Sequence, residues 1–191
     1  VQPAGEQVPL LLVHSVNAAA SALEIAPLFK HYQTTRPVWA LDLPGYGHSD
    51  RTERLYTPRL MTDAVMAVVR HMVAQTGCQA VDVLGLSLGS EFVVRAQIEA
   101  PGLIRRVALV SPTGFNARKP RRGAPGSTLM VPWLYRWLTR PARGEWLFRQ
   151  LTRPPVIRYF LRRTFGRREI DEPLWRYAAI TARQPGAHHA P

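Results

Sequence analysis

One serine stands between two glycines directly after an apolar run, in the stretch VDVLGLSLGSEF at residues 81–92. A serine at the end of a buried strand, with glycines two residues to either side, fits a sharp turn from strand into helix. Such a turn strains the serine backbone, so the residues two positions to either side must be small, and Gly85 and Gly89 meet this need. We therefore predict Ser87 as a nucleophile, with the N–H of Leu88 as an oxyanion donor at the helix start. The alternative is an ordinary glycine-rich connection in which Ser87 is only a small residue.

The loop after the first apolar run offers a second donor. In LLLVHSVNAAAS, residues 10–21, the run ends at His14. Adjacent parallel strands bring their carboxyl ends together, so this loop is expected beside Ser87, with the Val16 N–H as the second oxyanion donor. His14 is expected to tie the loop down by hydrogen bonds rather than to act as a base.

A rigid polar loop follows the second apolar run. The stretch ALDLPGYGHSD at residues 40–50 is rich in turn-forming residues. Asp42 is expected to hydrogen-bond backbone groups within this loop, which is a structural role. His48 and Asp50 receive no assigned role.

Apolar runs and helical patterns alternate through the first part of the chain. Thr57 and Pro58 form an N-cap and first-turn pair, and Gly77 stands where a helix ends, so a long amphipathic helix is predicted between them. Ser21 and Glu24 form a capping box for an earlier helix, which Pro27 must bend or shorten. Nearly continuous apolar strands separated by helices indicate an α/β fold, a mostly parallel sheet with helices on both faces. The predicted strands are residues 8–13, 36–43, 80–85 and 105–111.

The pattern changes after residue 112. A linker rich in Gly, Pro and Arg precedes short Trp-containing helical segments, with Pro141, Pro155 and Pro173 near helix starts and Gly166 at a helix end. We divide the chain into a core domain at residues 1–112 and a basic helical cap at residues 113–191. The predicted cap helices lie near residues 129–139, 142–152, 155–165 and 173–183.

All of the net charge lies in the cap. Residues 1–112 hold nine basic and nine acidic residues, whereas residues 113–191 hold 16 basic and four acidic ones. The arginines alternate with Trp, Leu and Phe, which favours amphipathic helices. The basic face of these helices is expected either to be solvated or to contact an anionic membrane or ligand. Nucleic acid is the least favoured partner. The aromatic residues either roof an apolar pocket or pack the cap on the core: Trp133, Trp137, Trp146, Phe148, Phe160 and Trp175.

The chain resembles the first half of an α/β-hydrolase fold protein of the ester-hydrolase and haloperoxidase-like type. Four stretches together carry this resemblance: LLLVHSVNAAAS, ALDLPGYGHSD, LGLSLGSEF and VALVSP. The resemblance covers residues 8–112, and the remainder resembles the helical cap that many members insert. It implies a triad of Ser, acid and His in that chain order, with Ser87 as nucleophile and the Val16 and Leu88 N–H groups as oxyanion donors.

The chain departs from the family pattern in three ways. The triad acid and histidine normally follow two later strands, and His188 and His189 come too early for that position. The two strands that usually precede the first strand are missing, so we expect a fragment that lacks the first and last strands and barely turns over by itself. Ser15 replaces the glycine common after the histidine.

These observations favour a serine hydrolase acting on an ester, thioester or similar acyl bond of a small, largely apolar substrate. The alternatives are an acyltransferase, a cofactor-free haloperoxidase, or a catalytically incomplete module that binds a ligand or a surface. Attachment of the cap to a membrane is a further hypothesis. No metal-ligand spacing or dinucleotide fingerprint occurs, so no metal or cofactor is expected. The single cysteine, Cys78, and the lack of a visible leader or spanning segment predict a cytoplasmic protein, peripheral at a membrane if the cap binds one.

Overall fold

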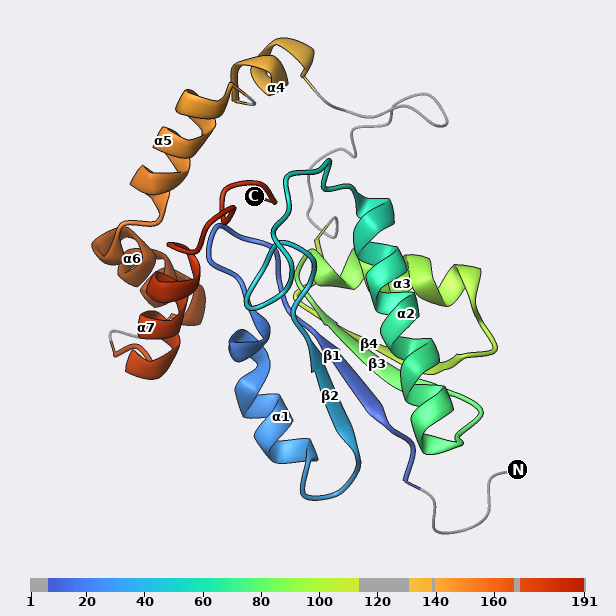
Figure 1. Ribbon diagram of the computed structural model, residues 1–191. Helices are drawn as coiled ribbons and strands as arrows, with labels where there is room; N and C mark the ends of the chain where they lie inside the picture. The colour runs from blue at the N-terminus through green and yellow to red at the C-terminus, as the bar shows by residue number, and fades with distance from the viewer. Residues whose placement is uncertain (1–6, 114–130, 139, 167–168, 191) are drawn as a thin grey trace.

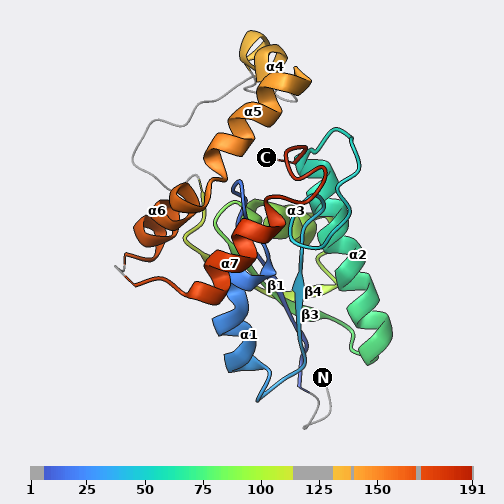
Figure 2. The ribbon, with the colours of Figure 1, turned by 60° about the vertical axis from the view of Figure 1, so that its left-hand side comes forward.

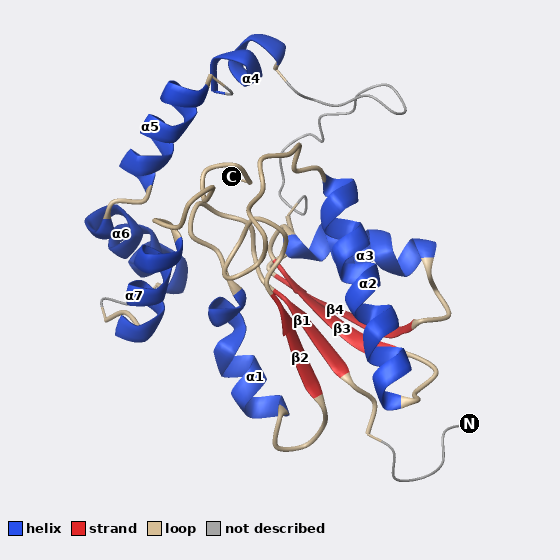
Figure 3. Cartoon of the chain, viewed as in Figure 1, coloured by secondary structure: helices blue, strands red, loops and turns tan. Residues whose placement is uncertain are grey.

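The computed structural model describes residues 7–113, 131–138, 140–166 and 169–190. Four strands form one sheet in the order β2-β1-β3-β4, and every neighbouring pair is parallel. The sheet lies between helices, as Figure 3 shows. The strands are β1 (Leu10–Val13), β2 (Val38–Leu41), β3 (Val81–Leu86) and β4 (Ile104–Val110).

Helices cover both faces of the sheet, as predicted. The core helices are α1 (Ala26–Tyr32), α2 (Pro58–Thr76) and α3 (Gly89–Glu99), and a 3-10 helix, η1 (Ala22–Ile25), precedes α1. Side chains of a strand alternate between faces, and Leu11 and Val13 of β1 pack in the cluster that contains the apolar residues of α2 and α3. Leu10 and Leu12 pack on the opposite face, with Ile25 and the apolar residues of α1. Figures 1 and 2 show α1 on one side and α2 and α3 on the other.

The signals at the ends of α2 act as predicted. The Thr57 side chain accepts a hydrogen bond of 3.2 Å from the Leu60 N–H, and Pro58 is in the first turn. Gly77 ends the helix in the left-handed conformation, with φ of 69°. These end signals are local, so the sequence alone was sufficient to predict this helix.

The predicted capping box at Ser21 and Glu24 is wrong. The Ser21 side chain makes no capping bond, and the segment opens with η1 instead of an α-helix. The Glu24 carboxylate turns to the loop after β1, where it accepts hydrogen bonds from the Ser15 hydroxyl at 2.6 Å and from the Asn17 side chain at 2.7 Å. These donors draw Glu24 away from the Ser21 backbone, and Pro27 is in the first turn of α1.

A buried carboxylate of β3 pairs with two arginines at the end of the sheet opposite Ser87. Asp82 of β3 accepts from Arg36 at 2.7 Å and from both the Nε and Nη2 of Arg105, at 2.9 and 2.8 Å. Burial by itself raises the pKa of Asp82, but the hydrogen bonds from Arg105 and Arg36 outweigh it and hold the pKa below its ordinary value. The ion pairs therefore link β3 to β4 and to the segment before β2.

In the described part of the chain after β4, four helices begin at or near prolines, as predicted, and that these helices form a cap domain stays a prediction. Gly166 ends the third of them in the left-handed conformation, with φ of 62°, and the Asp171 side chain caps the fourth. None of the described helices has both the length and the apolar character that crossing a bilayer requires. The cap helices are α4 (Pro132–Leu138), α5 (Pro141–Leu151), α6 (Pro154–Phe165) and α7 (Glu172–Thr181). The linker predicted at residues 112–127 lies almost wholly outside the described residues.

Candidate active site

Ser87 has the strained backbone that a nucleophile turn requires. It follows the last residue of β3 and has φ of 53°, a left-handed value that costs a non-glycine residue about 1–2 kcal/mol. Its N–H donates to the Val110 carbonyl of β4 at 2.9 Å, and its carbonyl accepts from the Ser90 N–H at 3.1 Å. These bonds fix the turn between strand and helix, so Ser87 lies at the carboxyl edge of a central strand, with Leu88 between it and the start of α3.

The two glycines are required by close backbone contacts. A Cβ atom built on Gly85 would lie 2.7 Å from the Cα of Ser90, and one built on Gly89 would overlap the carbonyl oxygen of His14. The Gly89 contact also locates the loop after β1 directly against the start of α3. The spacing of Gly85 and Gly89 around Ser87 therefore has a steric cause, as expected from the sequence.

His14 ties down the loop after β1. The ring is completely buried; Nε2 accepts a hydrogen bond of 3.0 Å from the Leu43 N–H, and Nδ1 lies 2.5 Å from the Ser15 carbonyl oxygen. Accepting at Nε2 and donating at Nδ1 requires the neutral ring. Burial lowers the pKa of His14, and the Ser15 hydrogen bond with the Glu24 and Asp42 charges offsets this only in part. With both nitrogens engaged, His14 is not a general base, in agreement with the prediction.

Replacing His14 with alanine is expected to destabilise the fold by about 2–4 kcal/mol at pH 8, because the Leu43 N–H loses its buried acceptor and a cavity forms. The folded-state pKa of His14 is below 6.5, so its contribution is complete above pH 6.5 and declines as the pH falls below that value. Urea unfolding at a series of pH values measures the gap in unfolding free energy between wild type and His14→Ala. A gap that stays constant from pH 8 to pH 5 would contradict the neutral-ring assignment, and His71→Ala, an exposed change on α2, is the matched control.

Asp42 organises the neighbouring loop, as expected. Its carboxylate accepts hydrogen bonds from the Ala22 N–H at 2.7 Å and from the His48 N–H at 3.0 Å. Gly47, with φ of 51°, lies so close that a Cβ there would overlap this carboxylate. Asp42 therefore links the loop after β2 to the start of η1, and all its bonding is structural.

The proposed oxyanion donors occupy the expected elements. Leu88 is the residue directly before α3, and the Val16 side chain packs against the main core cluster. Neither N–H donates to any of the described residues. Their joint action on a bound oxygen stays a prediction.

The comparison with known proteins agrees with this architecture. Residues 8–143 match a family model described as alpha/beta hydrolase fold. The chain belongs to this family. The alpha/beta hydrolase fold accounts for the parallel order of the strands and for a turn such as that of Ser87 at the carboxyl edge.

Individual relatives of this alpha/beta hydrolase chain carry differing activities in their names. The dihydrolipoyllysine-residue acetyltransferase component of the acetoin cleaving system of Cupriavidus necator is 42% identical over 81 residues, 41% of this chain and 20% of that protein. An esterase of Mycobacterium tuberculosis is 36% identical over 78 residues, 40% of this chain and 25% of the esterase. This chain therefore matches only a fifth to a quarter of the length of these relatives.

A solved structure extends the likeness to nearly the whole chain. The 2-hydroxy-6-oxo-6-phenylhexa-2,4-dienoate hydrolase from Rhodococcus sp. strain RHA1 superposes with a TM-score of 0.66 at 19% identity. The match covers 96% of this chain and 61% of that structure. At this identity the likeness shows the fold, including the helices after β4.

His188 and His189 of this alpha/beta hydrolase chain follow α7 and lie against each other, with ring centroids 4.3 Å apart. His189 Nδ1 is 2.8 Å from the carbonyl oxygen of Arg51, to which it donates. Burial, followed by the neighbouring His189, lowers the pKa of His188. No hydrogen bond joins either ring to Ser87 within the described residues, and the expectation that neither is the base stays a prediction.

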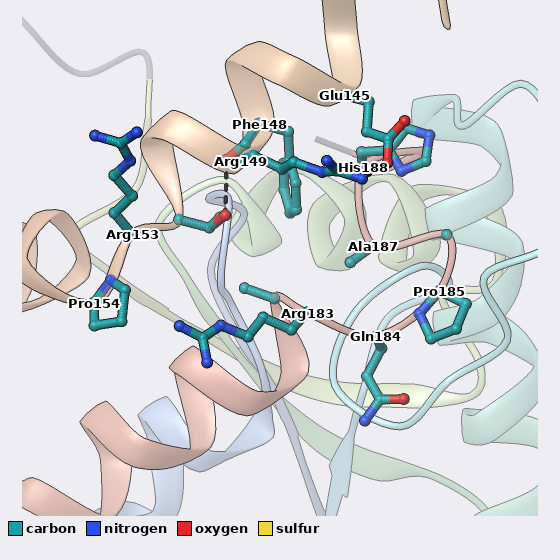
Figure 4. A pocket seen from close by; sticks show the side chains of 13 residues that line it. Glu145, Phe148, Arg149, Arg153, Pro154, Arg183, Gln184, Pro185, Ala187 and His188 are labelled. Carbon is teal, nitrogen blue, oxygen red and sulfur yellow. Dashed lines mark hydrogen bonds and ion pairs between the residues drawn. The ribbon is translucent and has the colours of Figure 1, made fainter. Parts of the chain in front are cut away.

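A cavity of about 500 Å³ lies between α5, the start of α6 and the segment after α7 (Figure 4). Its lining includes Phe148 and Ala187 with Arg149, Arg153 and Arg183, but it does not include Ser87. Of the six aromatic residues considered as a pocket roof, Phe148 is the single one that lines this cavity. In the described part of the chain no three His, Cys, Asp or Glu residues are grouped as a metal site would require.

The sequence did not reveal the contact between the end of the chain and the loop after β2. A Cβ on Gly186 would lie 2.5 Å from the Arg51 carbonyl, and Ala190 lies against Gly45. Arg51 in turn donates to the Gly47 carbonyl at 2.7 Å. These contacts join residues far apart in the sequence, and no local pattern marks them.

Proposed function

We propose that this chain supplies the nucleophile and the oxyanion donors of a serine hydrolase that cleaves an ester, thioester or similar acyl bond. The observation that carries the proposal is the left-handed backbone of Ser87, φ 53°, held between β3 and α3 with Gly85 and Gly89 in backbone contact. Such strain at a non-glycine residue favours a functional role, and the contacts of Gly85 and Gly89 distinguish Ser87 from Ser111, whose φ is 46°. The esterase relative and the hydrolase of the same fold give further support.

The proposed reaction begins with attack of Ser87 Oγ on the acyl carbonyl carbon. The Oγ proton passes to a general base as the new C–O bond forms, and the carbonyl π electrons move to oxygen. The N–H groups of Val16 and Leu88 then donate to this oxyanion, and the positive end of the α3 dipole adds to their effect. Collapse expels the leaving group, which takes the proton, and leaves an acyl group on Ser87.

The second half of the proposed cycle transfers the acyl group from Ser87 to water. A water molecule gives its proton to the base and attacks the acyl carbon, and Ser87 leaves with that proton returned to Oγ. The family resemblance makes the base a histidine. His14 cannot serve, because Leu43 and Ser15 already engage both ring nitrogens.

Acyl transfer is a second candidate, favoured by the acetyltransferase name of one relative. The two reactions share the acyl-enzyme and differ in whether water or another nucleophile accepts the acyl group. A small, largely apolar acyl substrate stays part of the proposal for both.

Turnover of nitrophenyl esters of increasing acyl length in the presence of hydroxylamine tests the proposal. Steady release of nitrophenol with free acid as the main product supports hydrolysis, whereas a hydroxamate fraction that rises with hydroxylamine supports transfer. For the protein expressed from its whole natural reading frame, saturable binding of the ester without release would contradict both reactions and favour the binding module.

A further inference from the structure

The outer surface of the first two cap helices carries exposed tryptophans. Trp133 and Trp137 of α4 are 67% and 41% exposed, and Trp146 of α5 is 59% exposed. Trp133 and Trp137 are four residues apart and so share one face of α4. Figures 1 and 2 show α4 and α5 at the outside of the molecule, away from the sheet. Three large indoles in water at one place are unusual for a surface without a partner.

Helix α5 has one buried face, and its exposed face belongs to this outer surface. Phe148 and Thr152 are buried against the rest of the cap. Trp146 lies on the opposite face with Arg143, an exposed residue three positions before it. Arg149, three positions after Trp146, is exposed at the border with the cavity that Phe148 also lines. Because Trp146 is 59% exposed, it contributes little to the packing of α5 on the molecule.

One continuous surface joins the two helices. The Arg143 guanidinium lies 5.6 Å from the centre of the Trp137 ring, a cation–π contact between α5 and α4. Arg143 thus connects the tryptophans of α4 with Trp146. We call this area the Trp/Arg surface, and it consists of Trp133, Trp137, Arg140, Arg143, Trp146 and Arg149.

The charge around the Trp/Arg surface is strongly positive. Residues 131–153 contain five arginines and one acidic residue, Glu145. Glu145 is paired with Arg149 at 2.6 Å. The described contacts of Arg140 and Arg143 include no ion pair, so their charges stay available to a partner.

We propose that the Trp/Arg surface binds membranes that contain anionic phospholipid. Indole rings settle at the level of lipid headgroups, where one edge is apolar and the other is hydrated. Arginines around them meet the lipid phosphates, and both contributions increase binding without a spanning helix. A nucleic-acid surface would use the arginines but would not need the exposed aliphatic residues Val131 and Leu134 beside them, which are 42% and 38% exposed.

Cosedimentation of the whole chain with vesicles tests this inference. Vesicles of phosphatidylglycerol mixed equally with phosphatidylcholine are expected to bind the protein, and pure phosphatidylcholine to bind it roughly tenfold less. Raising the salt concentration should weaken binding. The triple change Trp133→Ser, Trp137→Ser and Trp146→Ser should lower the partition coefficient by roughly tenfold or more, whereas Ile98→Ser, at a 73% exposed residue of α3, should leave it unchanged.

Two double variants that each remove two charges separate the effect of local charge on vesicle binding from the effect of total charge. Arg140→Gln with Arg143→Gln removes two charges from the Trp/Arg surface, and Arg70→Gln with Arg106→Gln removes two exposed charges from α2 and β4. The first pair should weaken vesicle binding several-fold, and the second should not. Equal effects of both pairs, or equal binding to neutral and anionic vesicles, would overturn the proposal. The proposal would also be overturned if the protein did not bind vesicles and instead formed a soluble dimer or a nucleic-acid complex that the triple tryptophan variant abolishes.

Discussion

Replacing Ser87 with alanine is expected to lower acyl-bond cleavage by roughly a thousandfold or more, because no covalent intermediate can form without Oγ. Steady-state kinetics with a nitrophenyl ester, on the protein expressed from its whole natural reading frame, measure the loss. Ser111→Ala is the matched control, since Ser111 also follows a strand and also has a left-handed backbone, with φ of 46°. Its neighbours two residues away are Leu109 and Thr113 instead of glycines. An equal loss in both variants would contradict the role of Ser87.

The stability of the Ser87 variants adds an independent readout. Glycine tolerates the φ of 53° at this residue, whereas alanine does not. Ser87→Gly is therefore expected to be more stable than Ser87→Ala by about 1 kcal/mol in urea unfolding, although neither cleaves esters. If Ser87→Ala were the more stable of the two, the turn would not hold the strained backbone on which the proposed nucleophile depends.

Replacing Gly89 with alanine is expected to lower both the stability of the fold and kcat. The new Cβ would overlap the carbonyl oxygen of His14, so the start of α3 and the loop after β1 must separate. Overpacking of this kind costs about 1–3 kcal/mol. Because the same movement separates the Leu88 and Val16 N–H groups, kcat should fall further than the loss of stability explains.

Gly102→Ala is the matched control for Gly89→Ala. A Cβ at Gly102 meets nothing within 4 Å. Unfolding free energy and kcat of the two variants, compared at a temperature where both are folded, test the steric argument. Equal and small effects on both quantities would mean that the contact between Gly89 and His14 does not organise the site.

Local patterns were sufficient to predict the strands, α2 and the cap helices. Apolar runs of strand length formed β1 to β4 within two residues of their predicted bounds, and prolines and Gly166 marked the helix ends. The prediction that Gly85 and Gly89 must lack bulk also held, since the need for small residues follows from the turn itself. The division into core and cap domains stays a prediction.

Features that depend on distant residues could not be predicted in this way. Glu24 has the correct spacing for a capping box, but Ser15 and Asn17 offer it better donors across a folded loop. The contact of His189 with Arg51 joins the segment after α7 to the loop after β2, and the cavity at Phe148 lies between α5, the start of α6 and the segment after α7. Likewise, the spacing of Trp133, Trp137 and Trp146 fits a pocket roof as well as an outer surface, and only the fold decides between them.

The most direct test of the central claim is to trap Ser87 covalently. The protein, expressed from its whole natural reading frame, is incubated with a fluorophosphonate, and the modified residue is identified by mass spectrometry of the intact protein and its peptides. The account predicts one phosphonyl group per chain, on Ser87, present in Ser111→Ala and absent in Ser87→Ala. Ester cleavage with Ser87 unmodified, or an adduct on a different residue, would contradict it.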